Sequence, residues 1–137
     1  MLTDSVQTGS KIWPYIQIAR FDHWFKNVFV LPGAVVAVYA EPDLLHFDMI
    51  WAILIALLAT GFVASSNYVI NEVLDAPFDA LHPVKRNRPV PSGQVNVKWA
   101  YAEWIGLGVL GIALASLLGF QFTLVAFALW IMGCVYN

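Results

Sequence analysis

The sequence predicts an all-α membrane protein, organised as a polytopic bundle of about four transmembrane helices. Of its 137 residues, 60% are hydrophobic and only 12% are charged, and the mean hydropathy is +0.70. A soluble domain has about half apolar and about a quarter charged residues. The apolar residues also gather in runs that approach the roughly 20 residues needed to cross a bilayer as a helix. The single cysteine, Cys134, excludes a framework of internal disulfides.

Residues 1–23 are predicted to form a cytoplasmic and interfacial segment. Trp13 and Arg20 belong to a stretch that mixes aromatic, apolar and polar residues, which is typical of a short helix at the membrane surface. Pro14 suits the first turn of such a helix. The earliest apolar run begins only near Trp24, so the pattern of a cleavable secretory signal is absent and the first span is expected to be retained.

Residues 24–137 are predicted to form the transmembrane region. The first span is short, and it crosses the bilayer only if Lys26 extends toward the headgroups. Pro32 in its middle is expected to kink it. The second span is strongly apolar, and its small residues Gly61 and Ser65 favour close packing. The expected spans are residues 24–40, 48–70, 97–118 and 120–136, and residues 71–96 are expected to form the loop between the second and the third.

The positive charges predict the orientation of this bundle. All seven Lys and Arg residues lie before or at the start of the first span, or between the second span and the start of the third. Four crossings place these regions on one side, which the positive-inside rule assigns to the cytoplasm. We therefore expect a cell (inner) membrane protein whose N-terminus and motif loop are cytoplasmic. The seven residues are Lys11, Arg20, Lys26, Lys85, Arg86, Arg88 and Lys98.

The acidic stretch directly after the second span contains the candidate metal site. If the helix continues, Asn71, Asp75 and Asp79 project from one face because they repeat every four residues, and Glu72 lies on the adjacent row. Mg²⁺ prefers such oxygen ligands, with further positions taken by water and phosphate. Pro77 is expected to end or kink the helix nearby and to leave Asp79 on a turn. The alternative is that these acids only solvate a helix end.

Three cations follow the acids and are the candidate phosphate ligands: Lys85, Arg86 and Arg88. They are close enough in sequence to fold back over the acids, and Lys or Arg donors beside a bound metal suit a diphosphate. The alternative is that they only determine topology, and both roles are compatible. Nucleic-acid binding is not expected, because the basic cluster is small and lacks interleaved aromatic residues.

These residues resemble the motifs of the UbiA-type intramembrane prenyltransferases. Residues 71–79 are similar to the family's first aspartate-rich motif, NDxxDxxxD, and residues 82–93 match its HPxKRxRPxxSG phrase. Residues 24–27 also resemble the opening of the family's first helix. The resemblance implies an all-helical bundle in which Mg²⁺ holds a polyprenyl diphosphate, whose tail lies in an apolar cavity. It implies a transferase that moves the prenyl group to a lipophilic acceptor, such as an aromatic compound.

The resemblance also assigns roles to individual residues. Asn71, Asp75 and Asp79, together with Glu72, would bind the metal, and the three cations would contact phosphate. His82 is expected to be a loop residue rather than a ligand. Glu72 departs from the family pattern, because the family usually has Asp at this position.

The resemblance covers only the front part of the family fold. The family has further spans and a second aspartate-rich motif, which this sequence lacks. We therefore expect an incomplete N-terminal portion, about half of a larger fold, that is inactive alone and needs a C-terminal half or a complementary subunit. Two alternatives stay open: transfer of a phosphoribosyl group to a polyprenyl phosphate, and a noncatalytic membrane half-unit or scaffold.

Overall fold

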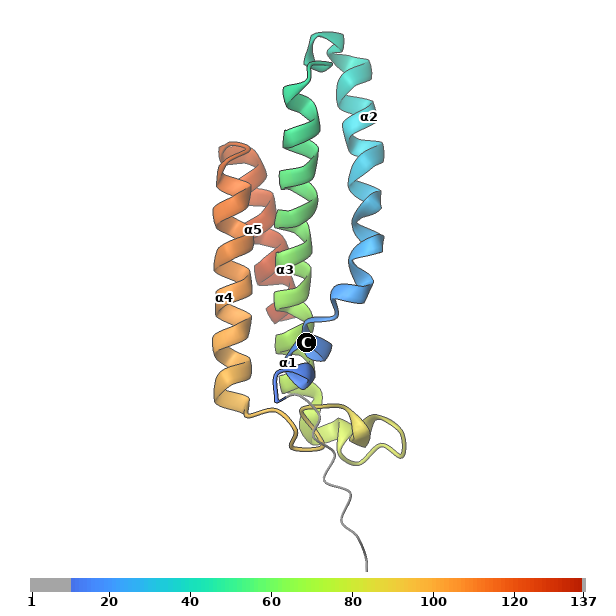
Figure 1. Cartoon of the computed structure of the whole chain (residues 1–137), viewed down its shortest axis with the longest axis vertical. Coiled ribbons are helices and arrows are strands. Elements are labelled where there is room, and N and C mark those ends of the chain that lie inside the picture. Colours follow the sequence, from blue (N-terminus) through green and yellow to red (C-terminus); the bar gives the residue numbers. More distant parts are fainter. Residues whose placement is uncertain (1–10, 137) are drawn as a thin grey trace, which may run out of the picture.

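A computed structural model describes residues 11–136, and within them the fold is all-α, as predicted (Figure 1). The expectations for residues 1–10 and Asn137 lie outside the described residues. The chain forms the following elements in order: α1 (Trp13–Ala19), a 3-10 segment (Phe21–Phe29), α2 (Val30–Ala40), a 3-10 turn (Pro42–Leu44), α3 (Asp48–Asp79), a second 3-10 turn (Lys85–Asn87), α4 (Val97–Ser116) and α5 (Phe120–Val135).

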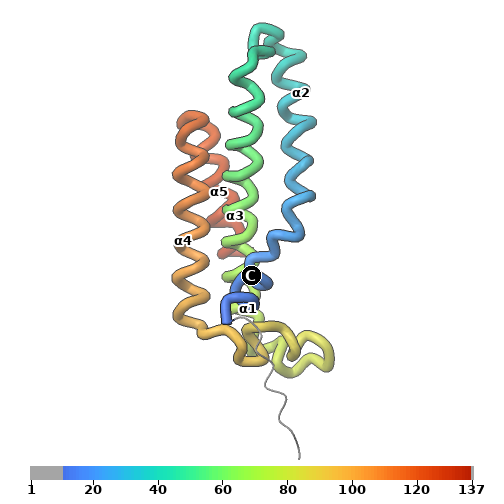
Figure 2. The backbone as a smooth tube through the Cα atoms, viewed as in Figure 1, coloured from blue at the N-terminus to red at the C-terminus, as the bar shows by residue number. Residues whose placement is uncertain are grey.

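The helix α3 is the central element of the bundle. It has 32 residues, with α2 beside it on one side and the antiparallel pair α4 and α5 on the other (Figure 2). Successive helices from α2 to α5 alternate in direction, so α1, the loop of residues 80–96 and the last residues of α5 lie toward the same end (Figure 1). The expected third and fourth spans thus form an antiparallel pair (Figure 1).

Two helices of the described residues are long and apolar enough to cross a membrane, namely α3 and α4. The helix α5 is also apolar but has only 16 residues. The first expected span is divided, because a 3-10 segment precedes the 11 residues of α2. Pro32 is the third residue of α2 and lies just after the change from 3-10 to α-helix, and not in the middle of one continuous α-helix as expected.

The end of α3 corrects one expectation. The helix does not end between Leu74 and Pro77 but continues to Asp79, with Pro77 inside it. Residues 71–79, which we expected in the loop, are therefore helical. Proline removes one backbone donor near the helix end, and the following turn still closes, because the N–H of Ala80 donates to the carbonyl of Ala76 at 3.0 Å.

Small residues let the helices approach closely. A Cβ atom on Gly61 would lie 2.8 Å from the ring of Trp24, and the Trp24 Nε1 donates to Ser65 Oγ at 2.8 Å. A Cβ atom on Gly111 of α4 would lie 2.7 Å from Val63 of α3. The packing role predicted for Gly61 and Ser65 is confirmed, and Gly111 has the same role on α4.

Ser66 joins three helices one turn before the acidic motif. Its Oγ donates to the carbonyl of Trp104 on α4 at 2.6 Å and accepts from Trp130 Nε1 on α5 at 2.9 Å. Asn67 adds a second link to α5, since its Nδ2 donates to the carbonyl of Leu129 at 3.0 Å. Hydrogen bonds of this kind fix the positions of helices within a bilayer. Here they place the second half of α5 beside the start of the motif.

A buried apolar cluster supports the motif end of α3. Ile18 and Ala19 of α1 pack there against α3, the following loop and the start of α4. This arrangement fixes the interfacial helix and the loop to the same end of α3 (Figure 1). The other buried members of the cluster are Val69, Val73, Val90, Val95 and Ala100.

Candidate functional site

The continuous end of α3 places Asn71, Asp75 and Asp79 along one side of the helix. A helix turns by about 100° per residue, so these positions are about 40° apart in succession. The expectation of a shared face is therefore met. Asp79 is the last residue of the helix, and does not lie on a turn after it as expected.

Asp79 is paired with the loop that follows α3. Its side chain is only 6% exposed, and its Oδ2 lies 2.7 Å from Arg88 Nη1, while its Oδ1 lies 3.6 Å from Lys85 Nζ. The loop thus folds back over the acids, as predicted for these two cations. The side chain of Arg86 is exposed and forms no ion pair within residues 11–136.

Asp75 differs from Asp79, because its half-buried carboxylate forms no hydrogen bond or ion pair with the described residues. Asp79, one turn away, is neutralised by its own cations, whereas the Asp75 carboxylate has no protein cation within residues 11–136. Such a carboxylate is a suitable ligand for an added cation. Asp75 is therefore the acid of the motif that the fold leaves most available.

Asn71 faces α5. Its hydrogen-bonding environment orients the amide so that Nδ2 donates to the carbonyls of Gly133 at 3.1 Å and Asn67 at 3.2 Å. Beside it lies a largely apolar cavity of about 280 Å³ between α3 and α5. The cavity is lined by Ala64, Asn67, Tyr68, Asn71, Leu129, Met132, Gly133 and Tyr136.

Glu72 points toward the loop. It is only 4% exposed, and its Oε1 accepts a hydrogen bond from the backbone N–H of Val90 at 3.2 Å. The sequence analysis placed Glu72 among the metal ligands and gave no signal for this partner, which lies 18 residues away.

His82 organises the loop, as predicted. Its Nδ1 accepts hydrogen bonds from the backbone N–H groups of Val84 and Lys85, each at 3.2 Å. A ring nitrogen engaged in this way shapes the turn that carries Lys85. His82 is thus a loop residue.

The donor set fits Mg²⁺ shared with a phosphorylated ligand. No group of three or more His, Cys, Asp or Glu side chains is positioned to hold a metal ion among residues 11–136. Mg²⁺ is usually bound by one or two carboxylates together with water and substrate phosphates. Asp75 supplies such a carboxylate and Asn71 a neutral oxygen, whereas binding by Asp79 requires sharing it with Arg88.

The structure adds a second basic group that the sequence analysis did not connect with the motif. The guanidinium carbon of Arg20 lies 5.4 Å from the ring centre of Tyr68, and His23 contacts the same ring edge-on at 5.5 Å. Tyr68 lies one turn before Asn71. The sequence gave no signal for this contact, because it joins segments almost 50 residues apart.

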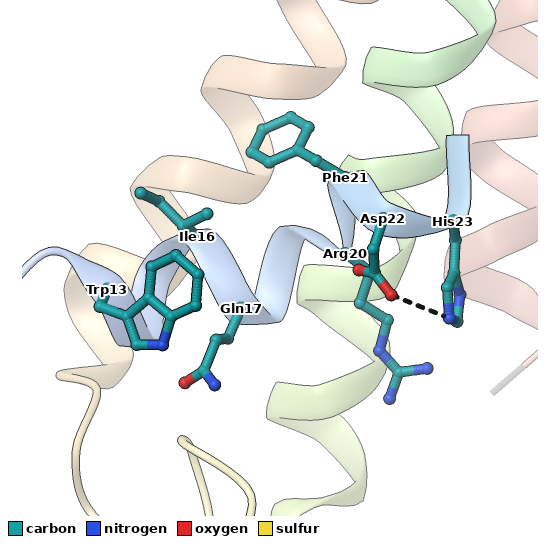
Figure 3. Close-up of a pocket in the computed structure, with 7 residues that line it drawn as sticks. All are labelled: Trp13, Ile16, Gln17, Arg20, Phe21, Asp22 and His23. Carbon is teal, nitrogen blue, oxygen red and sulfur yellow. Dashed lines mark ion pairs between the residues drawn. The ribbon is translucent and has the colours of Figure 1, made fainter. Parts of the chain in front are cut away.

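Arg20 and His23 belong to a pocket of about 580 Å³ at the α1 end of the molecule. Figure 3 shows them at one end of it with Asp22, and Trp13 at the other. His23 Nε2 lies 3.4 Å from Asp22 Oδ2.

The chain resembles known proteins over most of its length. The model of the UbiA prenyltransferase family matches residues 27–137. Digeranylgeranylglyceryl phosphate synthase of Saccharolobus solfataricus is 39% identical over 84 residues, which cover 61% of this chain and 29% of the relative. Decaprenyl-phosphate phosphoribosyltransferase of Mycolicibacterium smegmatis is 33% identical over 103 residues, which cover 74% of this chain and 30% of the relative.

The corresponding phosphoribosyltransferase of Mycobacterium tuberculosis is 31% identical over 103 residues, which cover 75% of this chain and 34% of the relative. The chain thus spans about a third or less of the length of these relatives. The family match includes α2 to α5 and every residue of the acidic motif and the basic loop. On this match, the chain belongs to the UbiA prenyltransferase family.

Proposed function

We propose that the chain is the N-terminal part of a Mg²⁺-dependent intramembrane transferase that acts on a polyprenyl diphosphate. It transfers the prenyl group to a lipophilic acceptor, such as an aromatic compound. The observation that carries this proposal is the placement of Asp75, an acid without a protein partner in residues 11–136, between Asn71 and the Asp79–Arg88 pair. Family membership supports the reaction class.

The proposed roles follow from charge and position. Asn71, Asp75 and Asp79 hold the metal, which supplies charge neutralisation at the diphosphate when bound. Lys85 and Arg88 extend from the loop over the same helix end and bind phosphate oxygens, and Arg86 is a further candidate.

The chemical step breaks the bond between the prenyl carbon and the diphosphate oxygen. The leaving diphosphate gains negative charge, and fixed cations at its oxygens lower the barrier because they stabilise that charge as it develops. The apolar cavity beside Asn71, which is open on one side, would accommodate part of the isoprenoid chain.

The membrane setting follows from the same elements. The two long apolar helices and the family assignment indicate a membrane protein. We propose four crossings, made by α2 with its preceding 3-10 segment, α3, α4 and α5. In this arrangement the motif, the basic loop and α1 face the cytoplasm, where the cations of the chain are concentrated.

Phosphoribosyl transfer to a polyprenyl phosphate is the second candidate. The matched phosphoribosyltransferases cover 74–75% of this chain, a larger share than the 61% covered by the synthase. A metal flanked by Lys and Arg donors also suits a phosphoribosyl diphosphate donor. The same residues would then hold the sugar donor in place of the lipid diphosphate.

We further propose that the rest of a family-length protein, or a complementary subunit, completes the site. The relatives are about three times as long as the region matched. Among the described residues, α2 has no buried side chain and α5 has one, Ala126, so both helices have apolar faces that lipid or further helices would cover. Half of the diphosphate charge would lack a partner in this chain alone, so the chain alone is inactive.

The test is a transfer assay in lipid vesicles with Mg²⁺. The chain is assayed alone and together with the C-terminal portion of a family-length protein. One arm supplies labelled geranylgeranyl diphosphate with aromatic acceptors, and the other supplies labelled phosphoribosyl diphosphate with a polyprenyl phosphate. Label on the acceptor in the first arm supports prenyl transfer, and label on the lipid in the second supports phosphoribosyl transfer.

Two outcomes contradict the proposal. Turnover by the chain alone would show that it is not an incomplete part. A noncatalytic scaffold, the third possibility, would keep its function when Asp75→Asn and Asp79→Asn are introduced into the assembled protein, whereas a metal-dependent transferase would lose most of its activity.

A further inference from the structure

We infer that Glu72 is a positioning residue, which holds the basic loop on α3 and thereby places Arg88, and that it is not a ligand of the metal. The effect on turnover rests on the proposed function. The attachment of the loop does not, since it stands on contacts in the structure.

The first observation is where Glu72 points. The helix turn of about 100° per residue places it only about 20° from Asp79 but about 100° from Asn71. Its carboxylate is 4% exposed and accepts the N–H of Val90 at 3.2 Å, in a hydrogen bond that is itself buried. Glu72 therefore lies in the row that faces the loop, and Asp75 lies between that row and Asn71.

The second observation is that Val90 is an anchor. Its side chain is 7% exposed and belongs to the buried cluster with Val69 and Val73 of α3. The side chain of Val90 thus packs against α3, and its backbone N–H donates to a residue of the same helix. A buried N–H needs an acceptor, and Glu72 provides the one that the structure gives to Val90.

The third observation is the stiff connection from Val90 to Arg88. Pro89 separates them, fixes its own φ and restricts the residue before it to extended backbone, and Arg88 has φ −62° and ψ 154°. Hydrogen bonds close the turn beyond: Ser92 N–H to the Arg88 carbonyl and Gly93 N–H to the Val90 carbonyl, each at 3.0 Å. The position of Val90 therefore determines where Arg88 leaves the loop.

These contacts attach the loop to α3 at two points. Glu72 holds Val90, and Asp79 holds Arg88 at 2.7 Å, seven residues further along the helix. Residues seven apart share a helix face, so the two attachments lie in one row. A glutamate reaches the Val90 amide with one more methylene than an aspartate has, which gives a structural reason for glutamate at this position.

The test compares three variants of the assembled, family-length protein in lipid: Glu72→Gln, Glu72→Ala and Asp75→Asn. The first readout is hydrogen exchange at the Val90 amide. Glutamine keeps the Oε1 acceptor, so exchange should match that of the unsubstituted protein, whereas alanine should accelerate it by about fivefold or more. Equal exchange in the alanine variant and the unsubstituted protein would overturn the attachment.

The second readout is the Mg²⁺ concentration that gives half-maximal turnover, together with KM for the phosphorylated substrate. Asp75→Asn should raise the Mg²⁺ requirement. Glu72→Gln should leave both values unchanged, and Glu72→Ala should raise KM at an unchanged Mg²⁺ requirement. A rise in the Mg²⁺ requirement of Glu72→Gln, comparable to that of Asp75→Asn, would make Glu72 a ligand and overturn the inference.

The two readouts separate this inference from the proposed function. If the unsubstituted protein transfers nothing, the proposed function fails, and exchange at Val90 still decides whether Glu72 holds the loop. If Glu72→Ala does not fold, Glu72→Leu, which fills similar space without an acceptor, takes its place in the exchange measurement, and Glu72→Gln still decides the Mg²⁺ requirement.

Discussion

Arg88 Nη1 lies 2.7 Å from Asp79 Oδ2, so a cation of the loop is joined to the last residue of α3. A guanidinium has five donors, and one carboxylate occupies only part of them. The pair therefore fixes Arg88 over the helix end and leaves donors for a phosphate group. It also holds two charges of opposite sign at the end of α3, where we propose the metal and phosphate site.

Arg88→Ala should lower the transfer rate of the assembled protein by about 10²- to 10³-fold, the effect of removing one preorganised donor from developing charge. Arg86→Ala should cost less, below about tenfold, because the side chain of this further phosphate candidate is exposed and forms no ion pair within residues 11–136. Steady-state kinetics with Mg²⁺ and the labelled substrate give both values. Equal losses would contradict the assignment of Arg88.

Asp75→Asn should reduce activity without reducing stability. The carboxylate has no partner in the described residues, so the free energy of unfolding should change by about 0.5 kcal/mol or less. The transfer rate should fall by about 10²-fold or more, since a metal ligand is lost. Thermal unfolding in detergent and the transfer assay measure the two effects. A large loss of stability would show that Asp75 has a structural role.

Gly108→Ala should destabilise the bundle, because a Cβ atom there would lie 2.5 Å from the Trp130 ring. We expect a loss of about 1–3 kcal/mol, the usual cost of overpacking. Gly106→Ala on the same helix meets nothing within 4 Å and should be neutral or slightly stabilising. Unfolding in mixed micelles compares them, and equal stabilities would contradict the packing of α4 against α5.

Ser66→Ala should loosen the contact of α3 with α4 and α5. The substitution removes the acceptor of Trp130 Nε1 and the donor to the Trp104 carbonyl. Hydrogen bonds between membrane helices contribute about 0.6 kcal/mol each on average and at most about 1.7 kcal/mol, so a loss of roughly 1–3 kcal/mol is expected. Ser116→Ala, whose hydroxyl donates only within its own helix at 2.6 Å, is the control and should cost less.

The sequence predicted the helices well where composition determines them. Long apolar runs define α3 and α4, and the small residues Gly61 and Gly111 mark the faces that pack closely. The shared face of Asn71, Asp75 and Asp79 also followed from spacing alone. The effect of Pro77 could not be predicted, because the cost of one lost backbone hydrogen bond depends on the packing around the helix end.

Contacts between distant segments were beyond the sequence. Nothing in the pattern connects Glu72 with the amide of Val90 or Arg20 with Tyr68, since both contacts depend on how the loop and α1 fold against α3. The sequence analysis placed Glu72 among the metal ligands, because its hydrogen bond to the loop depends on which face of the helix the loop covers and cannot be read from the motif. A hydrogen bond to a backbone N–H, such as that of Val90, is especially hard to predict, because every residue except proline has this group.

The most direct test of the central claim is metal binding at the end of α3. Mn²⁺ replaces Mg²⁺ in the assembled protein in lipid nanodiscs, and electron paramagnetic resonance measures bound Mn²⁺ with and without geranylgeranyl diphosphate. We predict bound Mn²⁺ that requires the diphosphate, and a loss of about tenfold or more in affinity in Asp75→Asn. Equal binding by the Asp75→Asn variant and the unsubstituted protein would contradict the claim that this face holds the metal.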